Sequence, residues 1–236
     1  SEDDDVLLTS GAGKAIRFKV TDIRRFVGRT SSGVRGIKLA DGDEVISMAI
    51  LRHVDIETDE ARAYMKHANA MRRAMGDDVE DDSSDDTAIE TSLNEERLGF
   101  LQANEQFVLT LADDGFGKRS SSYDYRCMNR GGQGVSAQDL GRKGAPDAEL
   151  VRSFTISDDD QLMLVTDGGQ LIRCPVRNIS VISRSSKGVM VLRTNDDEKV
   201  VSVERIEDQG EDEDEDAVLT TDGGDGAADD SPNASE

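Results

Sequence analysis

The chain has 236 residues and a formal net charge of −22 at pH 7, a length that accommodates one or two domains with a substantial core. Its sequence contains neither an apolar run of membrane-spanning length nor a signal peptide, so we expect no membrane association. Cys127 and Cys174 stand alone, without a disulfide framework or metal-ligand spacing. This cysteine usage favours a reduced, cytoplasmic protein.

The negative charge is unevenly distributed along the chain. Residues 1–5, 53–97 and 207–236 together carry 31 of the 50 acidic residues but only 5 of the 28 lysines and arginines. The remaining residues, 6–52 and 98–206, contain 23 Lys and Arg against 19 Asp and Glu. The acidic balance therefore belongs to termini and one internal segment, and the rest of the chain is mildly basic, which keeps nucleic acid among the expected partners.

Three stretches are copies of one repeat: 6–51, 107–141 with its continuation 149–156, and 162–206. In every copy a glycine precedes an arginine by four residues, and a second arginine precedes a Gly-Val pair by four. The first spacing joins Gly13 to Arg17, Gly115 to Arg119 and Gly169 to Arg173. The second joins Arg29 to Gly33, Arg130 to Gly134 and Arg184 to Gly188. The glycine-rich stretch around Arg130 is thus one copy of a repeated element and no isolated nucleotide loop.

Each repeat reads as four short strands rich in Val, Ile and Leu and separated by turn residues. In the third repeat we expect strands at about 162–166, 170–174, 188–193 and 199–206. Four strands in about 50 residues are typical of a propeller-like blade. Because three blades cannot close a ring, and because the sequence opens without an initiator Met, we expect further blades before residue 1.

The segment 53–97 interrupts the repeats and has a different sequence pattern from theirs. Apolar residues at helical spacing predict a helix over 58–75, with Thr58 as a plausible N-cap. Residues 76–87 and the tail from 207 are acidic and poor in apolar residues, which predicts disorder. We therefore predict an all-β chain of blades at 1–52, 98–156 and 157–206, with a helical acidic insertion at 53–97 and an acidic tail at 207–236.

Most candidate sites have a simpler structural interpretation. "GAGK" at 11–14 lacks the glycine spacing and the Ser or Thr of a phosphate-binding loop. His53 and His67 are expected on the surface, without a matching metal or catalytic set. No activating group accompanies the three tyrosines, so packing explains them better than nucleophilic catalysis. Paired carboxylates fall at turns. We expect no catalytic residue and no metal site.

The recurrent arginines are the strongest candidates for a function. Equivalent positions in successive blades fall on one edge of the array, so the arginines would form a curved basic stripe suited to a bent phosphate backbone. The alternative is a set of strand-edge charges that prevent aggregation. The candidate DNA-binding residues are Lys14, Arg17, Arg29, Arg35, Lys118, Arg119, Arg130, Arg173, Arg184 and Lys187.

The ordered set "GKAIRFK", "RTSSGVRGIKLADGDEVIS", "DGFGKR" and "DGGQLIR…ISVISRSSKGVMVLRT…DEKVVSVERI" resembles the last three blades of the C-terminal domain of the DNA gyrase A subunit. The resemblance covers about 6–52 and 98–206. It implies a β-pinwheel, a propeller variant whose blades exchange strands, which bends DNA around a basic rim. Residues 128–134 match the family's Gln-Arg-Arg-Gly-Gly-Lys-Gly box at four of seven positions, in a later blade than the box itself.

The resemblance also implies the enzyme to which this module belongs. In the whole enzyme, a type IIA topoisomerase with two A and two B subunits, wrapping by this module supports ATP-dependent negative supercoiling. ATP and Mg²⁺ would bind elsewhere, so we expect no cofactor in this segment. The expected partners are double-stranded DNA, the rest of the A subunit, and the B subunit. Two alternatives remain open: the corresponding domain of the topoisomerase IV A subunit, and a propeller that binds basic proteins through its acidic segments.

Overall fold

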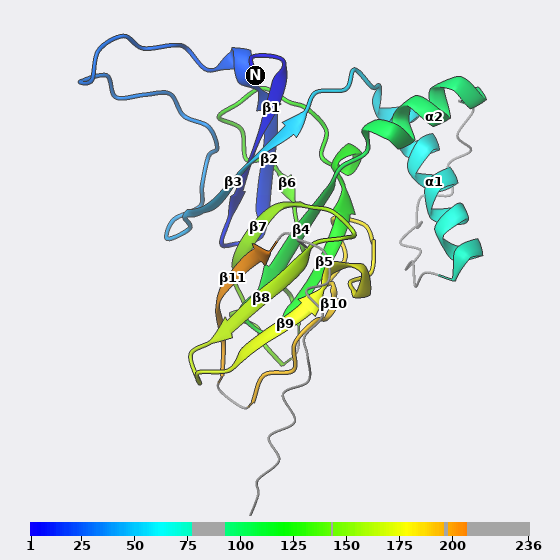
Figure 1. The fold of residues 1–236 in the computed structure, drawn as a ribbon. Coiled ribbons are helices and arrows are strands. Elements are labelled where there is room, and N and C mark those ends of the chain that lie inside the picture. The colour runs from blue at the N-terminus through cyan, green and yellow to red at the C-terminus, as the bar shows by residue number, and fades with distance from the viewer. Residues whose placement is uncertain (77–92, 143, 196–197, 207–236) are drawn as a thin grey trace, which may run out of the picture.

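The computed structural model of the chain describes residues 1–76, 93–142, 144–195 and 198–206. Within them it contains eleven strands, two α-helices and three short 3-10 helices (Figure 1). The disorder expected for residues 77–87 and 207–236 lies outside this range. None of the described helices is long and apolar enough to cross a membrane.

Each repeat contributes three adjacent antiparallel strands to one sheet. The first two form a hairpin, and the last returns to the other side of the first strand. In the first repeat these are β1 (Asp4–Ser10), β2 (Lys14–Lys19) and β3 (Val45–Arg52). In the second they are β4 (Phe107–Ala112), β5 (Phe116–Ser121) and β7 (Leu150–Ile156). In the third they are β8 (Gln161–Thr166), β9 (Leu171–Pro175) and β11 (Val200–Ile206).

The remaining short strand of a repeat joins the sheet of the preceding repeat. β6 (Val135–Ser136) pairs with β2, and β10 (Val189–Met190) pairs with β5. Blade 1 is therefore β3-β1-β2-β6, blade 2 is β7-β4-β5-β10, and blade 3 is β11-β8-β9. The all-β, strand-exchanging fold is confirmed, but the prediction of three four-stranded blades is wrong for blade 3. Among the described residues no later repeat supplies its outer strand, and the corresponding stretch of the first repeat, residues 33–38, forms no strand.

The repeated glycines are explained by backbone geometry at the junctions between blades. Gly134 has a φ of 73° and Gly188 a φ of 87°, values in the left-handed region. A Cβ on Gly134 would lie 2.3 Å from the carbonyl oxygen of Ala15, in the preceding blade. Gly33 shares the conformation, with a φ of 74°, but its Cβ position has no heavy atom within 4 Å. Glycine is thus required where an exchanged strand meets its neighbour.

The core is built between blades, because each sheet packs its inner strands against the next blade. Leu109 and Leu111 of blade 2 share one apolar cluster with Leu162 and Leu164 of blade 3. A second cluster joins β1 and β3 of blade 1 to β4 and β7 of blade 2. Each such buried side chain contributes about 1.5–3 kcal/mol relative to exposure, so the blades hold one another in a fixed relative orientation.

The insertion forms two helices that lie together at one side of the sheets, α1 (Thr58–Met75) and α2 (Glu95–Asn104) (Figure 1). The helix predicted at 58–75 is confirmed, but its N-cap is Glu57, without a side-chain cap. The helical part also continues beyond residue 97, where a blade was expected. It does so because a second helix begins only after Asn94, whose Oδ1 accepts the Arg97 amide at 2.8 Å, and this helix buries Leu101 in the cluster with Tyr123.

A separate apolar cluster attaches the insertion to the second repeat. Leu101 of α2 and Tyr64 of α1 are both buried, and they pack with Tyr123 of the short helix η2 (Ser122–Asp124). The two tyrosine rings meet edge to face, with centroids 5.4 Å apart, a favourable aromatic geometry. The insertion is therefore anchored to the junction between the first two blades.

Candidate nucleic-acid interface

Two of the recurrent arginines are buried at blade junctions. Arg17 is 4% exposed; its Nε donates to Asp5 Oδ2 at 2.8 Å, and its guanidinium also donates to the carbonyl oxygen of Ser122 at 2.8 Å. Arg119, at 6% exposure, takes the same position one blade later, donating to the carbonyl oxygen of Ile179 at 2.6 Å and pairing with Asp158. The expectation that Arg17, Arg119 and Arg173 form one exposed stripe is therefore wrong. Two of the three join neighbouring repeats inside the protein.

Lys118 is also withdrawn from the surface. Its residue is 0% exposed, and its Nζ donates to the carbonyl oxygens of Ser183, Arg184 and Ser186. A buried ammonium requires this kind of full hydrogen bonding to offset its lost hydration. Lys118 therefore holds the loop before β10 in shape, and the expectation that it contacts DNA from the surface is wrong.

Arg130 and Arg184 occupy equivalent positions and are partly buried. Arg130 Nε donates to the carbonyl oxygen of Asp22 at 2.9 Å, and Nη1 to that of Arg35 at 3.0 Å. Arg184 Nε donates to the carbonyl oxygen of Asp124, and Nη1 to that of Ser136, both at 2.9 Å. Each arginine therefore links its own loop to the preceding repeat while keeping part of its side chain at the surface.

The other five candidates, Lys14, Arg29, Arg35, Arg173 and Lys187, are exposed. Arg29 and Arg35 belong to an extended stretch, residues 23–38, which we call the basic arm. It reaches away from the sheets (Figure 1). The arm also carries Arg24, Arg25 and Lys38, all exposed and absent from the sequence-based set. The sequence does indicate a basic segment here, because residues 24–38 contain five basic residues and no acidic one.

The three repeats present their bases from equivalent loops. The basic arm corresponds to the loop before β6 in the second repeat and to the loop before β10 in the third. Those two loops add the exposed bases Arg126 and Lys187 to the partly buried Arg130 and Arg184. β3 contacts β7, and β7 contacts β11, so these last strands face one another at the inner edges of the blades. β6 and β10 lie at the opposite edges of their sheets, which places the loops before them at the outer edge of the array.

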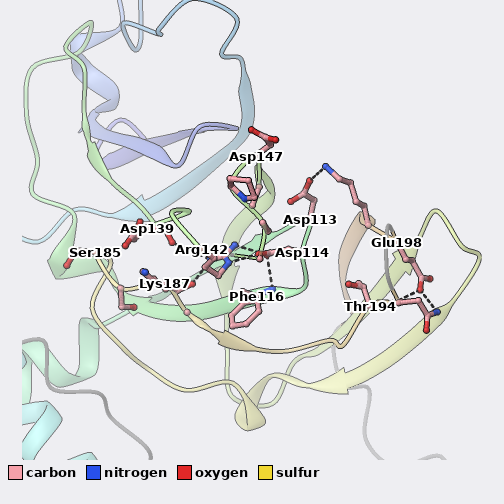
Figure 2. A pocket seen from close by; sticks show the side chains of 18 residues that line it. Asp113, Asp114, Phe116, Asp139, Arg142, Asp147, Ser185, Lys187, Thr194 and Glu198 are labelled. Atoms are coloured by element: carbon pink, nitrogen blue, oxygen red, sulfur yellow. Dashed lines mark hydrogen bonds and ion pairs between the residues drawn. The ribbon is translucent and has the colours of Figure 1, made fainter.

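A different electrostatic environment is found in an open cavity of about 1340 Å³ between blades 2 and 3 (Figure 2). Here Arg142 pairs with Asp114 and stacks 4.8 Å from the centroid of the Phe116 ring. Lys199 Nζ lies 2.6 Å from Asp113 Oδ2, a contact that raises the lysine pKa. Three further acids, Asp139, Asp147 and Glu198, also line this cavity, against one further base, Lys187, which lies at its border with the loop before β10. It is therefore poorly suited to phosphate, in contrast to the outer loops.

The tyrosines take no position suited to catalysis. Tyr64, Tyr123 and Tyr125 are at most 4% exposed. Burial, as the largest cause, raises the pKa of Tyr123 to about 12 and raises the pKa values of the other two as well. Their hydroxyl groups stay protonated at neutral pH, in agreement with the packing role expected from the sequence.

Comparison with known proteins settles the family. The model of the DNA gyrase C-terminal domain, a beta-propeller, matches residues 4–52, 106–145 and 160–207. This chain belongs to that gyrase C-terminal domain family. The matched segments are the three repeats, and the unmatched residues between 52 and 106 contain both helices of the insertion.

Relatives agree with this assignment, and a solved structure shares the fold. The DNA gyrase A subunit of Granulibacter bethesdensis is 42% identical over 94% of this chain, and that of Rickettsia typhi is 37% identical over 94%. The chain spans about a quarter of the length of these relatives, 25% and 24%. The crystal structure of the C-terminal domain of DNA topoisomerase IV aligns with a TM-score of 0.58 at 17% identity, over 87% of this chain and 47% of that one. This likeness shows a shared fold.

Proposed function

We propose that the chain is the DNA-binding and DNA-wrapping module of a gyrase A subunit. The observation that carries the proposal is the placement of exposed bases on three equivalent outer loops, above all on the basic arm, in a member of the gyrase C-terminal domain family. Successive blades turn these loops around the array, so a bound duplex would follow a curved path. Contacts to phosphates carry no sequence information, and binding would be independent of sequence.

The distribution of charge supports this function despite the acidic total. In the inter-blade cavity Arg142 and Lys199 are paired with aspartates, whereas the arm carries bases alone. Local clusters of Lys and Arg release counterions when they bind DNA, and this release contributes favourably to the binding free energy whatever the charge of distant segments. The deformation energy of a bent duplex, of order 1–6 kcal/mol for a site of 20–30 bp, would be offset by contacts on successive loops.

The enzyme to which the module contributes is part of the same proposal. Within a heterotetramer of two A and two B subunits in the cytoplasm, DNA wrapped on this module would be presented to the strand-passage core, and ATP and Mg²⁺ would be bound elsewhere. The same fold in topoisomerase IV makes the corresponding domain of that enzyme the second candidate. A propeller that binds basic proteins through its acidic segments is the alternative from another class.

Paired variants test the DNA interface. Arg29→Gln with Arg35→Gln removes two charges from the arm, and Arg62→Gln with Lys66→Gln removes two from α1 as a matched control. We expect the arm variant to bind unrelated duplexes more weakly, with a log–log salt slope shallower by about 0.9 for each lost phosphate contact. Arg130 and Arg184 stay intact because they hold the loops. Equal slopes for the two variants would refute the assignment of the arm.

DNA wrapping can be measured separately from DNA binding. Ligation of nicked circular DNA in the presence of the chain should give products whose linking number shifts consistently in one direction. Binding without wrapping would leave the linking number unchanged, and a protein-interaction propeller would show neither effect.

A further inference from the structure

Three side chains with metal-binding atoms meet beside the buried Arg17. They are Asp5 of β1, His53 just after β3 and Cys127 in the loop after η2. One candidate ligand atom from each lies within 4.8 Å of the other two. His53 Nδ1 is 3.0 Å from Asp5 Oδ1, and Asp5 is fully buried. No spacing in the sequence points to this cluster, because its members are 48 and 74 residues apart in the chain, and His53 was expected at the surface on its own.

The cluster lies at the junction of blades 1 and 2, and the junction of blades 2 and 3 provides a comparison within the same chain. Strand register aligns Arg17 with Arg119. The same register places Phe107, Asp158 and Val181 at the positions of Asp5, His53 and Cys127. Each junction supplies a carboxylate for its buried arginine, Asp5 in the first and Asp158 in the second. The fold therefore requires one acid at a junction and leaves the imidazole and the thiol of the first junction unexplained.

We propose that Asp5, His53 and Cys127 bind one zinc ion, with water as the fourth ligand. Carboxylate, imidazole and thiolate are the three ligand types that Zn²⁺ takes in proteins, at about 2.0–2.3 Å in tetrahedral geometry. Such geometry requires ligand atoms about 3–4 Å apart, so the aspartate–histidine distance already fits and the thiol has to approach by about 1 Å or less. Binding forms a Zn–S bond and releases the Cys127 thiol proton to solvent.

The surroundings of the cluster suit an accessible, oriented site. Arg17 Nε donates to Asp5 Oδ2 at 2.8 Å and fixes the carboxylate, in the way that outer hydrogen bonds orient metal ligands. His53 and Cys127 line an open cavity of about 750 Å³ that extends to α1. The positive charge of Arg17 limits affinity, which makes exchangeable binding the expectation.

The ligands come from blade 1, from the start of the insertion and from the loop that the second repeat packs on blade 1. A bound ion would therefore join three segments at one junction. Because the unfolded chain does not assemble these ligands, binding should stabilise the fold in proportion to metal occupancy.

Titration with Co²⁺ tests the proposal on the full chain in a non-thiol reductant. We expect one thiolate-to-cobalt charge-transfer band that saturates at one equivalent and is abolished by added Zn²⁺. Cys127→Val, which installs the residue of the second junction, should lose the band, and Cys174→Ser should keep it as the matched control. His53→Asn should weaken Co²⁺ binding by about tenfold or more. Zn²⁺ should raise the unfolding temperature of the parent chain and leave that of Cys127→Val unchanged.

Carboxylates of the acidic segments can bind Co²⁺ without a thiolate band, so they do not imitate the expected signal. No charge-transfer band at saturating Co²⁺, or a band that persists in Cys127→Val, would overturn the proposal. Cys127→Ser serves as a second variant, and circular dichroism without metal checks that each variant folds. A band lost equally in Cys174→Ser would also refute the site.

Discussion

Arg17 and Asp5 form an ion pair that is sealed between two blades, with Nε 2.8 Å from Oδ2 and side-chain exposures of 4% and 0%. The guanidinium also donates to the carbonyl oxygens of Ser122 and Arg52, which belong to different repeats. One side chain thus holds the first strand, the last strand of its own blade and the following repeat. The orientation of blade 2 on blade 1, and with it the path of any ligand that spans both, depends on this contact.

Removing the arginine should be costly. Arg17→Met leaves the Asp5 carboxylate buried without its partner, and we expect the free energy of unfolding to fall by about 3–5 kcal/mol in urea titrations. Arg173→Met, at the equivalent but exposed position, should change it by less than about 0.5 kcal/mol. The double variant Arg17→Met with Asp5→Leu should recover most of the loss, because no buried charge remains. Similar losses for the two single variants would contradict the structural role of Arg17.

The two conformationally matched glycines should respond differently to alanine. Gly134→Ala adds a Cβ 2.3 Å from the Ala15 carbonyl oxygen, whereas Gly33→Ala meets no atom within 4 Å. Both replacements bear the cost of a positive φ, roughly 1–2 kcal/mol. Crowding should add about 1–3 kcal/mol at Gly134 alone. Denaturant midpoints measure the difference, and equal effects would show that β6 does not pack on β2 as the structure has it.

The contact between the two helices of the insertion should depend on pH. Hydrogen bonds from Arg97, with Nε 2.6 Å from Glu60 Oε1, are the largest cause that lowers the pKa of Glu60 from its usual 4.5. A carboxylate with a lowered pKa in the folded state stabilises the fold above pH 4.5, and this contribution is lost as the pH falls through the folded-state pKa. The stability difference between the parent chain and Glu60→Gln should therefore shrink below pH 4.5.

Asp59→Asn is the control for that measurement, because the Asp59–Arg62 pair is largely exposed, with side-chain exposures of 74% and 56%, and exposed pairs contribute little. Urea titrations of both variants across pH 3–6 provide the comparison. A difference for Glu60→Gln that stays constant over this range would show that the carboxylate charge does not hold the helices together.

The acidic tail should compete with DNA for the outer loops. Residues 207–236 contain thirteen acidic residues and no Lys or Arg, and a tethered segment reaches an effective concentration of about millimolar. Truncation after Ile206 should therefore tighten DNA binding, most at low salt, because screening at physiological salt limits exposed charges to a Debye length of about 8 Å. Titrations of both chains at two ionic strengths test this. Equal affinities at low salt would rule out competition and leave the DNA-wrapping proposal standing.

The repeat spacing by itself determined the strand pattern and the place of the insertion, and apolar residues at helical spacing determined the helix at 58–75. These features are local: glycines at fixed intervals mark turns that only glycine adopts readily, and apolar periodicity distinguishes strand from helix. The composition of the basic arm is visible in fifteen consecutive residues, yet the repeat pattern selected only Arg29 and Arg35 of its five bases. The boundary between the insertion and blade 2 was misplaced because the Asn94 cap and the packing of Leu101 on Tyr123 lie outside any repeat.

Only the tertiary structure decided which basic residues are available to a ligand. Arg17, Arg119 and Arg173 occupy one register position, yet the first two are buried by the following repeat, while no described repeat follows the third. Because the blades exchange strands, the burial of a residue depends on a segment far along the chain. The periodicity within one repeat carries no information about that burial. The meeting of Asp5, His53 and Cys127 has the same origin, since the junction of two repeats brings together side chains that the sequence keeps far apart.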